Sequence, residues 1–143
     1  FTTSYRLPVY ATYTYTNAEF SSSFFNEQYG VVTKGDTIPY IAANQFALGA
    51  GVEHDDYGKF LLRSYYVGAM NTQPSSGSLQ KGPKTDAYYV VDLHVESPEI
   101  RKGLSLYLDV TNLFNNDYIV AWRPAGARPG MPLTALGGVK FSF

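Results

Sequence analysis

The stretch that decides the fold is Leu104-Ser105-Leu106-Tyr107-Leu108-Asp109-Val110-Thr111, where apolar and polar side chains alternate without a break. Successive side chains of a β-strand point to opposite faces, so this alternation predicts a strand with one apolar and one polar face. The same period of two recurs along the chain. We predict strands at about residues 7–22, 44–54, 59–71, 87–96, 103–112 and 132–143.

The connections between these strands alternate in length. Those at residues 23–43, 72–86 and 113–131 are long and contain Gly and Pro, whereas those at 55–58 and 97–102 are short. Transmembrane β-barrels have this asymmetry, with long loops outside the cell and short turns in the periplasm. The pattern therefore predicts an all-β fold, the wall of an antiparallel transmembrane β-barrel. A β-sandwich also has alternating strands, but its loops need not alternate in length.

The composition supports this class of protein. Aromatic residues make up 16% of the chain, and charged residues also make up 16%, below the roughly 25% of an average soluble domain. The net charge of −1 gives no reason to expect a nucleic-acid partner, and the absence of Cys excludes thiolate metal sites. We identify no signal peptide and no apolar run of the ~18–20 residues that a membrane helix needs. The segment Phe1-Thr2-Thr3-Ser4-Tyr5 reads as an interior cut point.

Four motifs, three of them in the C-terminal third of the chain and one upstream, resemble those of TonB-dependent outer-membrane receptors. Asp109-Val110-Thr111-Asn112-Leu113-Phe114-Asn115-Asn116-Asp117-Tyr118 resembles a V-x-N-L-F-[ND]-x-x-Y signature. Residues 123–132, RPAGARPGMP, resemble the loop before the final strand, although Leu133 stands where an Arg commonly follows the Pro. Residues 136–143, LGGVKFSF, resemble the terminal strand, and residues 35–45, GDTIPYIAANQ, resemble a segment of the ferric-citrate-type branch.

The resemblance implies that residues 1–143 are the C-terminal β-barrel segment of such a receptor. They would supply about six strands of a barrel of about twenty-two, without the plug. The implied function is energy-dependent uptake of a ferric chelate, a siderophore or a citrate-like one, across the bacterial outer membrane, by a protein that is not an enzyme. Its partners would be the TonB complex through the missing N-terminal part, the chelate, outer-membrane lipid and lipopolysaccharide, and the barrel-assembly machinery. No cofactor is expected, since the ferric chelate is cargo. The alternatives are a passive porin- or adhesin-type barrel and a secreted β-sandwich binding module.

Three residues are candidates for specific roles. Arg123 and Arg128 lie in the last long connection, and their guanidinium groups could bind an anionic chelate bidentately, or else pair with acids or lipopolysaccharide phosphates. Phe143 ends the chain on the apolar face of the last strand, which resembles the signal that the barrel-assembly machinery reads in this class. Its alternative role is an aromatic anchor at the membrane interface.

The remaining polar groups have structural interpretations. Residues 53–56, EHDD, could hold a hard metal ion, but their position predicts a solvated periplasmic turn. We expect His94 to face the lumen and bond the plug, and Gly49 and Gly51 to leave space for the plug or to allow strand coiling. The segment 112–118 could contact a ligand, but we expect its Asn and Asp side chains to hold a turn at the end of the strand, with Phe114 and Tyr118 at the membrane interface. Without a nucleophile motif, no catalytic triad can be argued.

Overall fold

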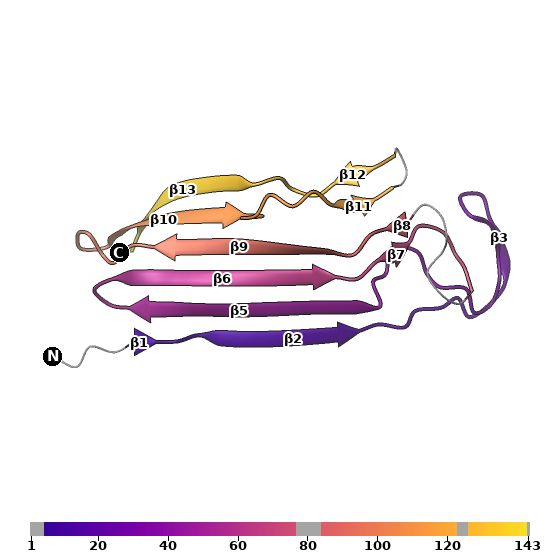
Figure 1. Ribbon diagram of the computed structural model, residues 1–143, viewed down its shortest axis with the longest axis horizontal. Helices are drawn as coiled ribbons and strands as arrows, with labels where there is room; N and C mark the ends of the chain where they lie inside the picture. Colours follow the sequence, from indigo (N-terminus) through magenta and orange to yellow (C-terminus); the bar gives the residue numbers. More distant parts are fainter. Residues whose placement is uncertain (1–4, 77–83, 123–125, 143) are drawn as a thin grey trace.

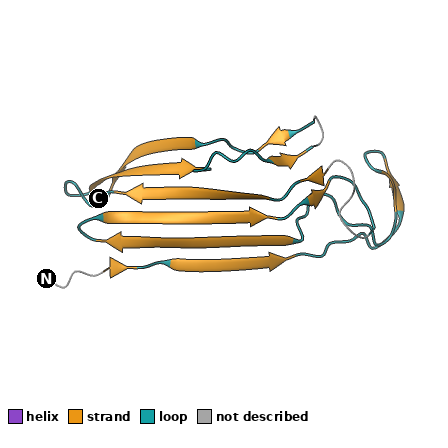
Figure 2. Ribbon diagram, in the orientation of Figure 1, coloured by secondary structure: helices purple, strands orange, loops and turns teal. Residues whose placement is uncertain are grey.

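The computed structural model describes residues 5–76, 84–122 and 126–142, and these residues form strands and connecting loops without helices (Figure 2). The main element is an antiparallel sheet in the order β1-β5-β6-β9-β10-β13, with β2 also paired to β5 (Figure 1). Its strands are β1 Tyr5–Arg6, β2 Val9–Tyr15, β5 Asn44–His54, β6 Gly58–Val67, β9 Tyr88–Glu96, β10 Leu104–Thr111 and β13 Thr134–Phe141. The sheet is a single curved layer that does not close on itself. The all-β, antiparallel expectation is confirmed.

The three long connections each fold into a small hairpin beyond the same end of the sheet (Figure 1). These hairpins are β3 Phe24–Asn26 with β4 Gly30–Val32, β7 Met70–Asn71 with β8 Lys84–Thr85, and β11 Ile119–Ala121 with β12 Arg128–Pro129. The two short turns lie at the opposite end. The sequence pattern therefore identified correctly which connections share an end, which we call the loop end and the short-turn end.

Two predicted strands were too long. The first is interrupted at Leu7 and Pro8, because proline has no N–H to donate to a ladder. It ends at Tyr15, because residues 16–22 turn away from the sheet. Pro8 keeps its contact with the neighbouring strand by accepting a bond from Gly51 N–H at 2.9 Å. The third predicted strand ends at Val67, and residues 70–71 pair with β8 instead of continuing along β9.

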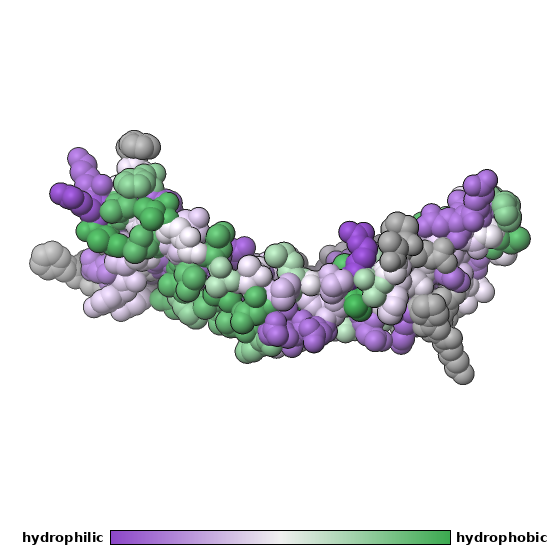
Figure 3. All heavy atoms as spheres, turned by 90° about the horizontal axis from the view of Figure 1, so that it is seen from above, coloured by the Kyte–Doolittle hydropathy of each residue, from purple (hydrophilic) through white to green (hydrophobic). Residues whose placement is uncertain are grey.

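One face of the sheet, the apolar face, carries hydrophobic side chains across every long strand. Directly paired residues of an antiparallel ladder lie on the same face, so the register assigns each side chain. Tyr13, Phe46, Tyr66 and Tyr89 form an unbroken cross-strand row near the loop end. Other members are Val9, Ala11, Leu48, Ala50, Val52, Phe60, Leu62, Val91, Leu93, Val95, Leu104, Leu106, Leu108, Val110, Ala135, Val139 and Phe141. Figure 3 shows hydrophobic residues gathered on the left and middle part of the convex side of the curved molecule.

The other face, the polar face, holds most of the charges of the sheet. Its members include Thr12, Thr14, Gln45, Glu53, Lys59, Arg63, Tyr65, Tyr88, Asp92, His94, Glu96, Ser105, Tyr107, Asp109 and Lys140. Two tyrosines of this face lie over glycines on the next strand: Tyr10 is paired with Gly49, and Tyr107 with Gly138. A Cβ on either glycine would overlap the ring. Gly49 therefore does not leave open space for a plug, because an aromatic ring from its partner strand covers it; strand coiling stays the other prediction for this glycine.

A single layer buries little. The buried hydrophobic residues in the described chain are Val32, Ala42, Met70 and Val90, whereas Phe141 and Val139 of the apolar face are 65% and 55% exposed. An exposed apolar area as large as this face must be covered by another medium or surface. The described residues contain no helix that is both long and apolar enough to span a bilayer.

Candidate functional site

Three tyrosines converge at the loop end of the polar face. Tyr65 of β6 and Tyr88 of β9 come from neighbouring strands, and Tyr118 folds over them from the connection after β10. Tyr88 and Tyr118 stack with ring centroids 4.4 Å apart and an interplanar angle of 26°. Together with Val67, Val90, Asp92 and Met131 they line a pocket of about 330 Å³, which we call the tyrosine pocket. Its stacked rings and open mouth suit a flat aromatic ligand.

Asn112 holds the wall of this pocket in place. It lies in the left-handed region with φ 51°, is 1% exposed, and makes bonds at both ends of its amide. Its Nδ2 donates to the carbonyl oxygens of Asn116 and Met131, both at 2.9 Å, and its Oδ1 accepts from Asn116 N–H at 2.9 Å. Its own N–H donates to Asp92 Oδ1 at 3.0 Å. The prediction that this segment holds a turn is confirmed, since one buried amide ties the end of β10 to the connection that carries Tyr118. The prediction that Tyr118 lies at the membrane interface is wrong, because Tyr118 stacks on Tyr88 over the polar face.

The loops above the sheet brace one another through polar side chains. Asn71 Nδ2 donates to Thr37 Oγ1 at 3.1 Å and to Ser75 Oγ at 3.0 Å, and Thr37 N–H donates to Ser75 O at 2.9 Å. Trp122 Nε1 donates to Lys84 O at 3.0 Å, which joins the third connection to the second. These bonds link loops that are far apart in the sequence, so they hold the loops at this end of the sheet in position relative to one another.

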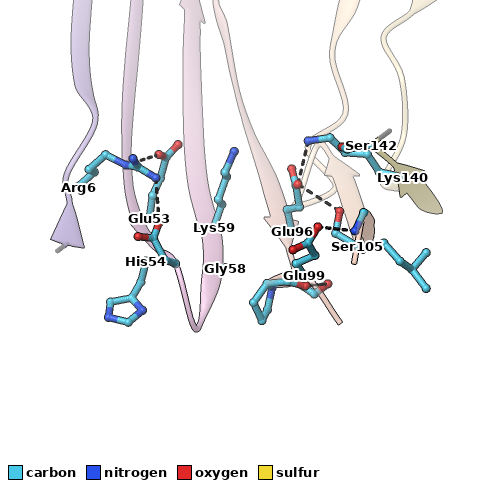
Figure 4. Close-up of a pocket in the computed structure, with 15 residues that line it drawn as sticks. Arg6, Glu53, His54, Gly58, Lys59, Glu96, Glu99, Ser105, Lys140 and Ser142 are labelled. Atoms are coloured by element: carbon cyan, nitrogen blue, oxygen red, sulfur yellow. Dashed lines mark hydrogen bonds and ion pairs between the residues drawn. The ribbon is translucent and has the colours of Figure 1, made fainter. Parts of the chain in front are cut away.

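Alternating charges line the polar face at the short-turn end (Figure 4). Arg6, Glu53, Lys59 and Glu96 are successive cross-strand partners, and Lys140 completes this charged row from β13. Arg6 pairs with Glu53 at 3.2 Å and with Asp55 at 3.3 Å, while Lys140 pairs with Glu96 at 2.9 Å. Opposite charges placed directly across a ladder favour this pairing of strands.

His94 joins the charged row to the middle of the sheet. Its Nδ1 lies 2.7 Å from Asp109 Oδ1, and its Nε2 lies 3.8 Å from Glu96 Oε2. His94 was expected to bond a plug; in this structure its partners are two carboxylates of the same sheet. Its role here is to connect β9 to β10.

The 53–56 segment does not form a metal site within the described residues. Glu53 and Asp55 both bind Arg6, whereas His54 lies on the apolar face, 5% exposed, between the rings of Tyr5 and Tyr57 at 4.5 and 4.6 Å. Its Nδ1 accepts from Asp56 N–H at 3.0 Å. The expectation of a fully solvated turn is therefore wrong for His54, which packs in an aromatic cluster.

The three residues singled out from the sequence are placed as follows. Arg128 lies in β12 at the loop end and is exposed. Arg123 and Phe143 fall outside the described residues. The tyrosine pocket was not predicted, because Tyr118 reaches Tyr88 only through the fold of a long connection. The alternation did place Tyr65 on the polar face, which was the available signal.

The chain belongs to the TonB-dependent receptor family: the model described as "TonB dependent receptor-like, beta-barrel" matches residues 1–113. Members of this family are receptors and transporters, which confirms that the chain is not an enzyme. Barrel homologues of this type are outer-membrane proteins of Gram-negative bacteria.

Among the relatives is the catecholate siderophore receptor Fiu of Escherichia coli K12, 28% identical over 109 residues. The match covers 75% of this chain and 14% of the relative, so the chain spans a small part of that receptor's length. The closed-form crystal structure of Fiu, described as a ferric-catecholate import receptor, superposes with a TM-score of 0.72 at 23% identity, covering 96% of this chain and 19% of the other. The open form gives 0.61 at 29% identity, covering 73% and 16%. The ferric-citrate-type branch is not confirmed by these relatives.

Proposed function

We propose that this chain is part of the barrel wall of an outer-membrane receptor that imports a ferric siderophore, and that the siderophore is of the catecholate type. Membership of the TonB-dependent receptor family supports the general activity. The observation that carries the ligand class is the tyrosine pocket on the polar face, since stacked rings match flat catechol groups. The printed function of the Fiu relative agrees with this assignment. The passive porin-type alternative gives no reason for such a pocket.

The proposed setting is the bacterial outer membrane. The apolar face would contact lipid, the polar face would line the lumen, and the loop end would lie outside the cell. His54 and Phe46 lie eight residues apart on the apolar face of β5. At ~3.3 Å per residue this is about 26 Å along the strand, which at a tilt of about 40° rises about 20 Å, most of the ~25 Å apolar band. The aromatic row through Tyr13, Phe46, Tyr66 and Tyr89 would mark the outer interface.

The rest of the receptor is also a proposal. We infer that the chain is the C-terminal segment of a barrel of about twenty-two strands, because the free edges of β2 and β13 need further strands in a bilayer. The receptor would be driven by the TonB complex through its other parts. Arg123 and Arg128 remain candidates for contact with the chelate or with lipopolysaccharide, and Phe143 for recognition by the barrel-assembly machinery.

The ligand assignment predicts different results for two adjacent tyrosines. In the full receptor, Tyr88→Leu should weaken binding of a ferric catechol complex about two- to tenfold, because ring stacking is worth ~0.5–1.5 kcal/mol beyond area burial. Tyr89→Leu is the matched control, because Tyr89 lies on the opposite, apolar face. Binding is measured with radioactive iron on cells that lack other iron receptors. Equal loss in both variants, or none in Tyr88→Leu, would count against the tyrosine pocket as the ligand site.

The membrane orientation predicts the accessibility of single labels on β13. A fluorophore at Val139, on the apolar face, should be quenched by a quencher dissolved in the bilayer, whereas one at Thr134, on the polar face, should not be. Both positions lie in the same strand, so differences in expression do not confuse the comparison. Quenching at Thr134 alone would reverse the assignment of the faces.

A further inference from the structure

A tyrosine ring also lies over a glycine beside the tyrosine pocket, in addition to the two such contacts within the sheet. A Cβ added to Gly130 would overlap the atoms Cζ, Cε1 and Cε2 of the Tyr118 ring. The same ring stacks on Tyr88, with the ring centroids 4.4 Å apart. The Tyr118 ring therefore has two close neighbours, the main chain of Gly130 and the ring of Tyr88.

The conformation of the main chain does not explain why residue 130 is a glycine. The φ angle of Gly130 lies outside the left-handed region, so an L-residue could adopt the same backbone. Gly130 is also outside the lining of the tyrosine pocket, which Tyr118 and Met131 form at this point. A larger residue would meet the Tyr118 ring first, so the close approach of this ring is the requirement that the glycine meets.

Two hydrogen bonds hold the main chain around Gly130. Its N–H donates to the carbonyl oxygen of Tyr118 at 2.8 Å, next to the pairing of Ile119 with Pro129. The carbonyl oxygen of the following residue, Met131, accepts from Asn112 Nδ2 at 2.9 Å. Because the main chain is held at these two points, a side chain at position 130 would displace the ring, which can rotate about its side-chain torsions.

We propose that Gly130 is a positioning residue for the tyrosine pocket: its lack of a side chain allows Tyr118 to stack on Tyr88, and the stacked pair forms the wall against which the ferric catecholate packs. Aromatic pairs are most stable in particular offset-stacked or edge-to-face arrangements, so displacing one ring weakens the pair and changes this wall. The inference rests on the proposed function and deepens it, because it assigns part of the ligand affinity to a residue outside the pocket lining.

The first test compares two glycine substitutions in the full receptor, with the ferric complex of catechol as the probe. Gly130→Ala should weaken binding per folded receptor about two- to tenfold, the range expected for loss of one ring stack. Gly138→Ala is the matched control, because Gly138 lies under the ring of Tyr107 and its φ is also outside the left-handed region. Tyr107 pairs with Glu96 at the opposite end of β9 from Tyr88. Gly138→Ala should therefore lower the thermal midpoint but leave the affinity of the folded receptor unchanged.

The second test separates positioning of the ring from a general effect on the hairpin of β11 and β12. If Gly130 acts through Tyr118, adding Gly130→Ala to Tyr118→Ala causes no further loss of affinity, because the added methyl group then meets no ring. Loss by the same factor with and without the Tyr118 ring would overturn the inference. Equal loss of affinity in Gly130→Ala and Gly138→Ala would overturn it as well.

Two further outcomes distinguish this inference from the proposed function. If the unaltered receptor binds no ferric catechol, the proposed function fails, and this inference fails with it. If the unaltered receptor binds the complex and Gly130→Ala binds it equally well, only this inference fails. Absence of any folded Gly130→Ala receptor would also contradict it, because the Tyr118 ring would then not have yielded to the added methyl group.

Discussion

Replacing Gly58 with alanine is expected to prevent most of the receptor from reaching its folded state. Gly58 sits in the tight turn between β5 and β6 with φ +88°, a conformation that costs an L-residue ~1–2 kcal/mol. A Cβ there would also overlap the carbonyl oxygen of Glu96 and approach the backbone of Ser97 and Pro98. These atoms belong to the next turn and cannot rotate away as a side chain would. We expect the two effects together to cost about 3 kcal/mol or more.

Gly30→Ala is the matched control for this experiment. Gly30 has φ +79° in the hairpin of β3 and β4, but an added Cβ would meet nothing within 4 Å. It should therefore show the backbone cost alone. The measurement is the amount of heat-resistant folded barrel in outer-membrane fractions, with the midpoint of thermal unfolding for whatever folds. If both variants lost the same amount of folded barrel, the close approach of the two turns would add nothing to the cost of a side chain at Gly58.

Asn112→Ala is expected to destabilise the barrel by about 2–4 kcal/mol, since it removes three hydrogen bonds to part-buried backbone groups at ~0.5–1.5 kcal/mol each. The groups are the carbonyls of Asn116 and Met131 and the N–H of Asn116. Because the same amide holds the connection that carries Tyr118, ligand binding should fall together with stability. The thermal midpoint of the purified receptor and the binding of ferric catechol both report this change.

Two further variants make the Asn112 prediction specific. Asn112→Asp keeps an oxygen for Asn116 N–H but loses both Nδ2 bonds, so its midpoint should lie between those of Asn112→Ala and the unaltered receptor. Asn17→Ala removes an exposed amide with a single 3.2 Å bond to Glu19 and should change the midpoint little. A midpoint for Asn112→Ala as high as that of Asn17→Ala would refute the structural role of the amide.

The sequence was sufficient to predict the long strands of the sheet, two of them with an end placed too far, together with their faces and the shared end of the long connections. Alternation over residues 104–111 predicts both the strand and the face of each side chain, because its period of two residues differs from the 3.6-residue period of a helix. The alternation could also have placed His54 on the apolar face, because His54 and Val52 are two residues apart in the same strand. Its charged neighbours in residues 53–56 favoured a solvated turn, and the packing between Tyr5 and Tyr57 depends on a strand distant in sequence.

The tyrosine pocket shows why the site was harder to predict than the fold. Tyr65 and Tyr88 are adjacent only in the register that aligns Tyr65 with Val90 and Val67 with Tyr88. Tyr118 joins them through a connection whose path is determined by the buried bonds of Asn112. The three short hairpins likewise depend on contacts between loops, such as those of Asn71 with Thr37 and Ser75, and their two- or three-residue strands are too short to show a period.

The charged row has a consequence for how the strands find one another. A slip of two residues between β6 and β9 would preserve the two faces, so hydrophobicity alone would not oppose it. Such a slip would place Leu61 opposite Glu96, or Lys59 opposite His94, in place of the present pairing of Lys59 with Glu96. The row of alternating charges at the short-turn end therefore favours the correct register over a slip of two residues. Hairpins paired in the wrong register would be less stable during assembly, before the barrel closes.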